Sequence, residues 1–351
     1  MKLKLCLLAL FCFCITVSAQ EYFPKNDGVK TKNSNYTAFK NAKIYVSPTK
    51  ILDNGTLLIQ NGKVVAVGNS VSIPENAVSI DLNGKYIYPS FIDMYSDFGI
   101  AEPKKPQSDN SPQYDASREG YYWNDHIMPE NNAVENFAFD KKKAKELLKA
   151  GFGVVNSHIS DGIVRGTSSL IALNNDASNS KRIITQKASQ VLSFEKSNAS
   201  RQAYPTSLMG AIALLRQMYY DAEWYQNGNA DGKDLSLEAL NNNKSLPQIF
   251  VANDKYNDIR ADKLGDEFKL NYIIKGGGNE FERIEEITKT NTSYIIPLDF
   301  PEAYDVTDPY IANKIALEEM LLWNQAPTNP KVLADNNITF AFTASDNKKT
   351  T

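Results

Sequence analysis

The sequence offers few side chains that could carry out acid–base, nucleophilic or metal chemistry. It contains two histidines, His126 and His158, and three cysteines, Cys6, Cys12 and Cys14. All three cysteines belong to the N-terminal apolar stretch, so beyond it only two imidazoles remain as candidate general bases or nitrogen ligands. Cysteine nucleophiles and cysteine-based zinc sites are therefore not expected in the rest of the chain.

The N-terminus is typical of a secretory signal peptide, which we assign to residues 1–19. Lys2 and Lys4 precede an apolar run, 5–17, that ends at Ser18 and Ala19. The run is shorter than the roughly 20 residues that a membrane-spanning helix needs. Cleavage after Ala19 would leave an exported protein, periplasmic or extracellular and of bacterial type, with no cysteine and no membrane span.

The composition is that of a globular protein without a nucleic-acid footprint. Of its 351 residues 42% are hydrophobic and 23% charged, and the net charge is −3. The basic run Lys141-Lys142-Lys143 is flanked by Asp140 and Glu146, so we interpret it as a solvated helix face. Nucleic acid is therefore not an expected partner.

Turn signals divide the chain into a polar leading segment, 20–37, and a small β unit, 38–89. In this unit short β-rich runs are separated by Asn61-Gly62, a strong hairpin signal, and by Asn83-Gly84. From residue 90 to residue 346 strands alternate with helices, for example a helix over 140–150 with Asp140 as its N-cap. This alternation predicts an α/β fold with a parallel sheet, and its length favours a (β/α)₈ barrel over a doubly wound sheet.

Further expected elements of this region are strands over 91–95, 153–157, 248–252, 270–274, 293–297 and 339–342, and helices over 205–225, 280–289 and 311–323. The glycine run Gly276-Gly277-Gly278 lacks the spacing of a phosphate-binding loop and is interpreted as a plain βα turn. The aromatic group Tyr219, Tyr220, Trp224 and Tyr225 has helical spacing and is interpreted as packing.

Two stretches, 59–68 and 80–94, resemble the amidohydrolase superfamily, in particular its dihydroorotase, hydantoinase and imidazolonepropionase-like branch. The resemblance extends from about Ala38 to Asp346. It implies a composite β-sandwich, built from both ends of the chain, before a TIM-type (β/α)₈ barrel. It also implies metal-dependent hydrolysis of carbon–nitrogen bonds in cyclic amides or imides.

The metal ligands of that family are not matched in this sequence. The His-x-His pair that follows the equivalent of Met94 corresponds here to Tyr95 and Asp97, and the fifth-strand histidine corresponds to Ala252. The strand-eight aspartate, a general base in the family, corresponds to Asp346. Because the family needs three or four histidine ligands, we expect no metal in this chain, and zinc only if it is nevertheless a hydrolase.

Two residues are candidates for a surviving pocket. His158 would lie at the end of an early barrel strand, where side chains face the site. Arg165 lies in the turn from Gly162 to Gly166, and this turn resembles a loop that follows the second barrel strand in the family. Its guanidinium could bind a carboxylate. His126, in a long aromatic loop, is interpreted as a packing residue.

Three functions remain open. The first is an exported, metal-free pseudoenzyme, the first half of a longer protein, with a C-terminal catalytic half or a second copy as partner. It follows from the apparent incompleteness of the barrel at its C-terminal end, after which only 347–351 remain. The second is a hydrolase that uses Asp97, His158 and Asp346. The third is a periplasmic ligand-binding module.

Overall fold

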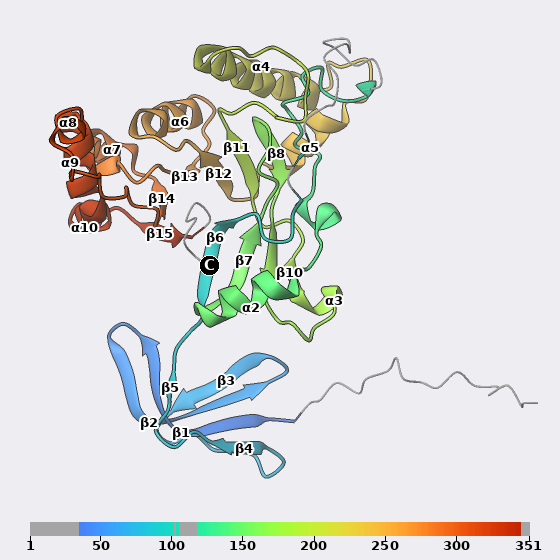
Figure 1. Ribbon diagram of the computed structural model, residues 1–351. Coiled ribbons are helices and arrows are strands. Elements are labelled where there is room, and N and C mark those ends of the chain that lie inside the picture. Colours follow the sequence, from blue (N-terminus) through green and yellow to red (C-terminus); the bar gives the residue numbers. More distant parts are fainter. Residues whose placement is uncertain (1–34, 102, 105–117, 345–351) are drawn as a thin grey trace, which may run out of the picture. The chain divides into compact units, whose positions relative to one another are not determined.

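The computed structural model describes residues 35–101, 103–104 and 118–344. The chain divides into two compact units between Pro89 and Ser90 (Figure 1). The predicted signal peptide, Asp346 and the tail 347–351 lie outside the described residues. Within the described part of the chain, no helix combines the length and apolarity needed to cross a membrane.

The first unit is a five-stranded sheet ordered β3-β2-β1-β4, with β5 also paired to β1. The predicted hairpin is confirmed, since β2 and β3 are antiparallel and both Asn61 (φ 52°) and Gly62 (φ 74°) have the positive φ of a type I′ turn. The described residues of this unit form this one sheet, and the composite sandwich stays a prediction. Its strands are β1 (Thr37–Ser47), β2 (Lys50–Gln60), β3 (Lys63–Gly68), β4 (Val78–Asp81) and β5 (Tyr86–Ile87).

The second unit contains two sheets, ordered β10-β9-β7-β6 and β15-β14-β13-β12-β11-β8. Strands β11 to β15 are parallel in chain order, as the strand–helix alternation predicts. The antiparallel strands β8 to β10 were not expected, because their apolar runs are short. The strands are β6 (Phe91–Ser96), β7 (Phe152–Ser157), β8 (Val164–Thr167), β9 (Ser169–Ala172), β10 (Ile183–Thr185), β11 (Gln190–Ser193), β12 (Gln248–Val251), β13 (Tyr272–Lys275), β14 (Ser293–Pro297) and β15 (Phe340–Thr343).

One predicted helix start in this unit is confirmed. The Asp140 carboxylate accepts hydrogen bonds from the backbone N–H groups of Lys142 and Lys143, which confirms it as the N-cap of α2. The helices are η2 (Ala133–Asn136), α2 (Lys141–Lys149), α3 (Asn179–Arg182), α4 (Leu208–Gln226), α5 (Leu235–Asn243), α6 (Lys255–Glu267), η3 (Glu280–Arg283), α7 (Ile284–Thr290), α8 (Pro309–Ala312), α9 (Leu317–Gln325), η4 (Ala326–Thr328) and α10 (Asn329–Asp335).

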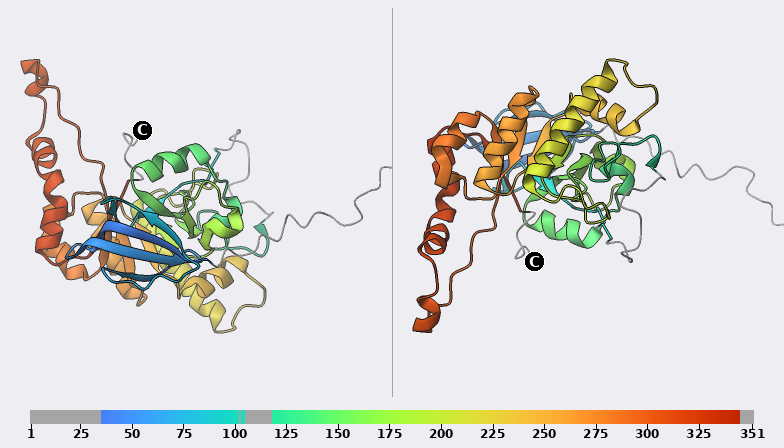
Figure 2. Two further views of the ribbon diagram at one scale, coloured as in Figure 1. Left: turned by 90° about the horizontal axis from the view of Figure 1, so that it is seen from below. Right: turned by 90° about the horizontal axis from the view of Figure 1, so that it is seen from above.

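The single helix expected over 311–323 is instead two helices, α8 and α9. Ala316 is extended between them, and its N–H donates to the Glu319 carboxylate, which starts a new helix. Neither helix has a buried residue, and both project away from the sheets of their unit (Figure 2).

Side chains of the six-stranded sheet alternate between two apolar layers. Phe250, Ile274 and Ile296 face the helices and pack with Leu215 of α4. The intervening side chains form a second cluster, Tyr95, Val191, Ile249, Val251 and Ile295. Because Tyr95 comes from β6 and the others from the six-stranded sheet, the two sheets share one apolar interior.

The two sheets meet at a seam between β15 and β6. The Thr343 hydroxyl lies 2.8 Å from Asp93 Oδ1 and 2.7 Å from the Tyr95 carbonyl oxygen. No strand ladder joins β15 to β6 among the described residues, and the chain passes between the sheets at Ser168, where β8 is followed by β9. The unit is therefore mixed α/β, and the closed (β/α)₈ barrel stays a prediction.

The glycine run after β13 is a site of close packing. A Cβ at Gly277 would lie 2.4 Å from the Asn253 carbonyl oxygen. A Cβ at Gly276 would lie 2.1 Å from Glu280 Oε1 and 3.4 Å from Asp258 Oδ2. The interpretation as a tight βα turn is thus supported, and two carboxylates converge beside it.

Asp258 is a fully buried acid of α6. Neither of its carboxyl oxygens has a hydrogen-bond partner among the described residues. Burial raises the pKa of Asp258 well above its usual value, and the neighbouring Glu280 and Asp254 raise it further. The folded state therefore binds the Asp258 proton more tightly than the unfolded chain does.

We expect the Leu215→Ala variant to lose about 2–5 kcal/mol of unfolding free energy, because Leu215 is fully buried in the helix-facing core. Chemical denaturation measures this loss. Met209 of the same helix is 81% exposed, so Met209→Ala should change the value by only about 0.5 kcal/mol. Equal effects of the two variants would contradict the assigned core.

We expect Asp258→Asn to raise the melting temperature at neutral pH. The native state binds the Asp258 proton more tightly than the unfolded chain does, so the unfolding free energy falls as pH rises above the unfolded-state pKa of about 3.9. The difference between wild type and variant should therefore shrink as pH falls toward about 4. Melting curves across pH test this, with the exposed Asp231→Asn as control; a pH-independent difference would contradict it.

Candidate ligand site at the strand ends

Three side chains that the sequence separates widely meet at the strand ends of the second unit. Arg165 of β8 donates from Nη1 to the Tyr95 hydroxyl at 3.2 Å. The Nζ of Lys275, the last residue of β13, lies 5.5 Å from the centre of the Tyr95 ring. Tyr95 near the end of β6 is thus approached by two cations.

Two further residues connect these cations. Glu195, after β11, accepts from Arg165 Nη2 at 3.3 Å and from Asn253 Nδ2 at 3.2 Å. Lys275 Nζ donates in turn to Asn253 Oδ1 at 2.7 Å. The five side chains form a continuous polar ring, which we call the strand-end ring: Tyr95, Arg165, Glu195, Asn253 and Lys275.

The members of the strand-end ring differ sharply in exposure. Arg165 is 2% exposed and Lys275 4% exposed, whereas the Glu195 side chain is 63% exposed. Arg165 is further fixed by a hydrogen bond from Nε to the Gly162 carbonyl oxygen at 3.1 Å. The cations are therefore held rigidly inside, and their carboxylate partner lies at the surface.

Both predicted pocket residues, His158 and Arg165, contact Tyr95. The buried ring of His158 lies 4.2 Å from the Tyr95 ring, centre to centre, and Arg165 binds the Tyr95 hydroxyl. His158 Nδ1 lies 3.0 Å from the Ile159 carbonyl oxygen, which fixes the imidazole plane.

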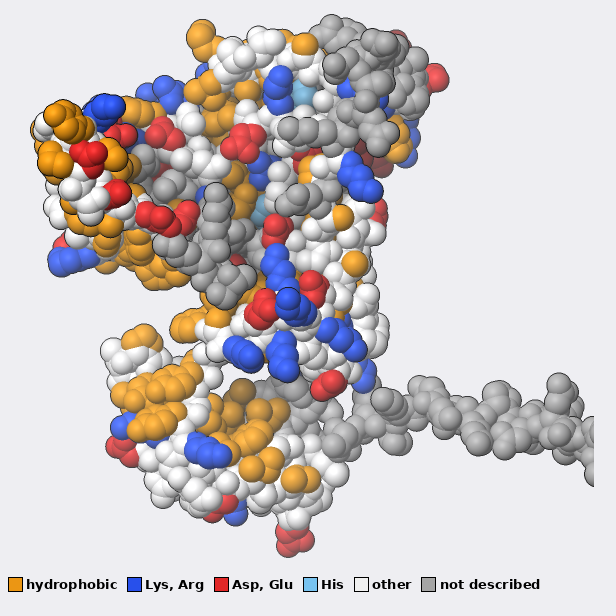
Figure 3. All heavy atoms as spheres, viewed as in Figure 1, with side chains coloured by type: hydrophobic (Ala, Val, Ile, Leu, Met, Phe, Trp, Pro, Cys, Tyr) orange, Lys and Arg blue, Asp and Glu red, His pale blue; other side chains and the backbone are white. Residues whose placement is uncertain are grey.

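The residues at the family's metal-ligand positions do not converge. Asp97 forms an ion pair with Lys143 of α2 at 3.1 Å, and both side chains are about half exposed. Figure 3 shows Lys and Arg side chains gathered over this helix with acidic side chains among them, as expected for a solvated face. Ala252 is buried in the helix-facing core, and Asp346 lies outside the described residues.

These residues do not fit a divalent metal. Tyr95 Oη accepts from a guanidinium, Asp97 pairs elsewhere and Ala252 has no donor atom. Among the described residues, no group of three or more His, Cys, Asp or Glu side chains could hold a metal.

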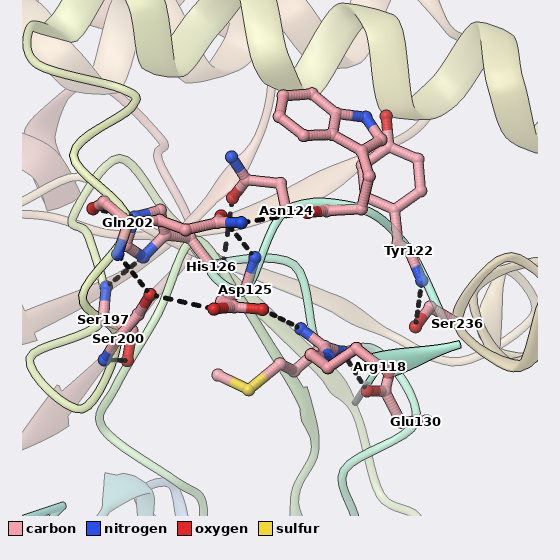
Figure 4. Close-up of polar contacts among 12 residues, drawn as sticks. Arg118, Tyr122, Asn124, Asp125, His126, Glu130, Ser197, Ser200, Gln202 and Ser236 are labelled. Carbon is pink, nitrogen blue, oxygen red and sulfur yellow. Dashed lines mark hydrogen bonds and ion pairs between the residues drawn. The ribbon is translucent and has the colours of Figure 1, made fainter. Parts of the chain in front are cut away.

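His126 lies away from the ring as a structural residue. It is fully buried, accepts from the Ser197 N–H at Nδ1 (3.0 Å) and donates from Nε2 to the Gln202 carbonyl oxygen (3.2 Å) (Figure 4). Burial lowers the pKa of His126, so its neutral form is favoured. Its hydrogen bonds join two loops, in accord with its interpretation as a packing residue.

The sequence did not predict that Glu195, Asn253 and Lys275 belong to the site. One signal was available, because Lys275 ends the apolar strand Tyr272–Lys275 directly before the glycine run. A lysine at a strand end is usually solvated, so burial of this one could be recognised only from the fold.

Comparison with known proteins gives the fold of the chain. No family model and no curated protein matches the sequence. Among solved structures, an amidohydrolase from Thermotoga maritima matches with a TM-score of 0.65 at 19% identity, over 89% of this chain and 79% of that one. A prolidase complexed with N-methylphosphonate-L-proline gives a TM-score of 0.45 at 12% identity, over 89% and 78%, which is too low to argue from. The first match supports the resemblance at the level of fold alone: the fold of this chain is similar to that of the Thermotoga maritima amidohydrolase.

Proposed function

We propose that this protein is a metal-independent binding protein with an amidohydrolase fold, and that its strand-end ring binds a small ligand that carries a carboxylate. The observation that carries the proposal is the buried guanidinium of Arg165, whose only carboxylate partner among the described residues is the exposed Glu195. A rigid buried guanidinium is a strong receptor for a carboxylate.

Glu195 acts in this proposal as a replaceable stand-in for the ligand. Its carboxylate accepts from Arg165 with one oxygen and from Asn253 with the other, as a ligand carboxylate would. Because the Glu195 side chain is mostly in water, moving it aside costs little, whereas the donors it leaves are fixed.

The remaining ring residues would orient the ligand. Lys275 Nζ already donates to Asn253 and lies over the Tyr95 ring, so it adds positive charge without moving. Tyr95 and His158 present adjacent rings against which an apolar or planar part of the ligand could pack.

A hydrolase built on Asp97, His158 and Asp346 is less well supported, because Asp97 pairs with Lys143 rather than with either cation of the ring. Export, a catalytic partner half and a second copy as partner stay predictions of the sequence argument, and none is needed for the proposed binding.

We expect the full chain to bind acetate, succinate or an N-acyl amino acid, but not the matched amide, in isothermal titration at low ionic strength. Arg165→Met should raise Kd about tenfold or more, since a hydrogen bond to a charged group contributes about 1.5–3 kcal/mol. Glu195→Gln should lower Kd, because it removes the competing charge.

Arg216→Met, at a surface pair with Glu267, serves as the matched arginine control. Carboxylate binding that is unchanged in both Arg165→Met and Glu195→Gln would reject the proposal. So would retention of about one equivalent of zinc by the purified chain, lost in Asp97→Ala, because that result would restore a metal site.

A further inference from the structure

A pocket lies between two loops of the second unit, and none of the residues of the strand-end ring lines it. Its volume is about 440 Å³, which falls in the usual range of small-molecule pockets. Its lining residues come from two segments, 118–131 and 197–200. A contact between Ser200 and Asp125 joins these two segments (Figure 4). Its principal lining side chains are Arg118, Tyr121, Asp125, Glu130, Asn131 and Ser200.

The walls of this pocket are fastened to each other. The Asp125 N–H donates to Gln202 Oε1 at 2.8 Å, and Gln202 Nε2 donates to the Trp123 carbonyl oxygen at 3.0 Å. His126 joins the same loops through Ser197 and Gln202. The pocket is therefore formed before any ligand arrives, which reduces the ordering cost of binding.

The polar groups that line the pocket include both hydrogen-bond donors and hydrogen-bond acceptors. Arg118 donates from Nη1 to Asp125 and from Nη2 to Glu130, each at 3.0 Å. Ser200 Oγ contacts Asp125 Oδ2 at only 3.4 Å, and Asn131 Nδ2 makes only a 3.6 Å contact to the Met128 sulfur. Asp125 and Asn131 can therefore accept from and donate to a ligand in addition.

The charge of the lining separates this pocket from the strand-end ring. Its lining holds one guanidinium between two carboxylates, so an anion would meet net negative charge. The guanidinium is already neutralised by protein carboxylates. The ligand that suits such a wall is neutral and offers many groups that both donate and accept.

An aromatic surface completes the lining. Tyr121 is 39% exposed, and the Arg118 guanidinium lies 5.5 Å from its ring centre, which holds the ring beside the polar wall. Met128 and Ala199 add apolar surface. A pyranose has this same division, with an apolar C–H face and a rim of hydroxyls.

We infer that the pocket binds a neutral saccharide, with one sugar face against Tyr121 and adjacent hydroxyls bonded to Asp125 and Asn131. Each hydroxyl would donate to a carboxylate oxygen and accept from the amide or the guanidinium. This inference is independent of carboxylate binding at Arg165, because no side chain is shared.

The test is a glycan array that carries neutral, acidic and amino saccharides, probed with the full chain, followed by titration of the best free glycan. We expect neutral glycans to be retained, with little effect of added NaCl. Tyr121→Ala and Asp125→Asn should each weaken binding about tenfold or more. Arg165→Met should leave it unchanged.

Two matched variants control for nonspecific effects. Tyr310→Ala removes an aromatic side chain that is 81% exposed, and Glu286→Gln removes another arginine-paired carboxylate, that of Arg283. Neither should change glycan binding. Tyr121→Ala alters a partly exposed ring, so an unchanged melting temperature would show that its loss of binding is not unfolding.

Retention of no neutral glycan would overturn the inference. It would also fail if only amino saccharides bound and NaCl abolished their binding, because the pocket would then be a site for an ammonium group. Equal loss of binding in the control variants would overturn it as well.

Discussion

The guanidinium of Arg165 is the constraint around which the strand ends are arranged. A group that always carries charge can be buried only if its donors are satisfied and its charge is balanced. The guanidinium donates one hydrogen bond to each of three residues from different places in the chain: Gly162, Tyr95 and Glu195. Tyr95 is thereby fixed near the end of β6, and its ring packs on the ring of His158.

The apolar interior makes this arrangement possible. Alternation along β11, β12 and β14 sends one set of side chains to the helices and the other set inward, where Tyr95 joins them. At the seam to β15, the Thr343 hydroxyl contacts β6 in place of a strand ladder. Tyr95, a member of the strand-end ring, is thus held by apolar packing between side chains of both sheets.

In the proposed site, residues that cannot bind a metal occur together with buried cations. In the family that this sequence resembles, imidazoles hold a dication, which a guanidinium and an ammonium group would repel. Here the position of one such imidazole is occupied by a tyrosine whose hydroxyl accepts from Arg165. The proposed site thereby offers donors for a carboxylate where the family offers ligands for a metal.

Local features were determined by the sequence alone. The Asn61-Gly62 hairpin, the Asp140 cap and the tight turn at Gly276 follow from φ preferences and from side chains that bond their own neighbours. The scarcity of histidine predicts that no metal is bound, and this stays a prediction. The helix expected over 311–323 was wrong because Glu319 caps a new start within it.

Only the tertiary structure decided which side chains meet. Arg165 and Tyr95 are 70 residues apart, and Lys275 reaches Asn253 from the neighbouring strand. Neither composition nor periodicity specifies such pairs, since they depend on strand order and on which face each residue takes. The burial of Lys275 and the pocket beside Arg118 were likewise decided only by the tertiary structure. Exposure is a property of the packed chain and not of a residue type.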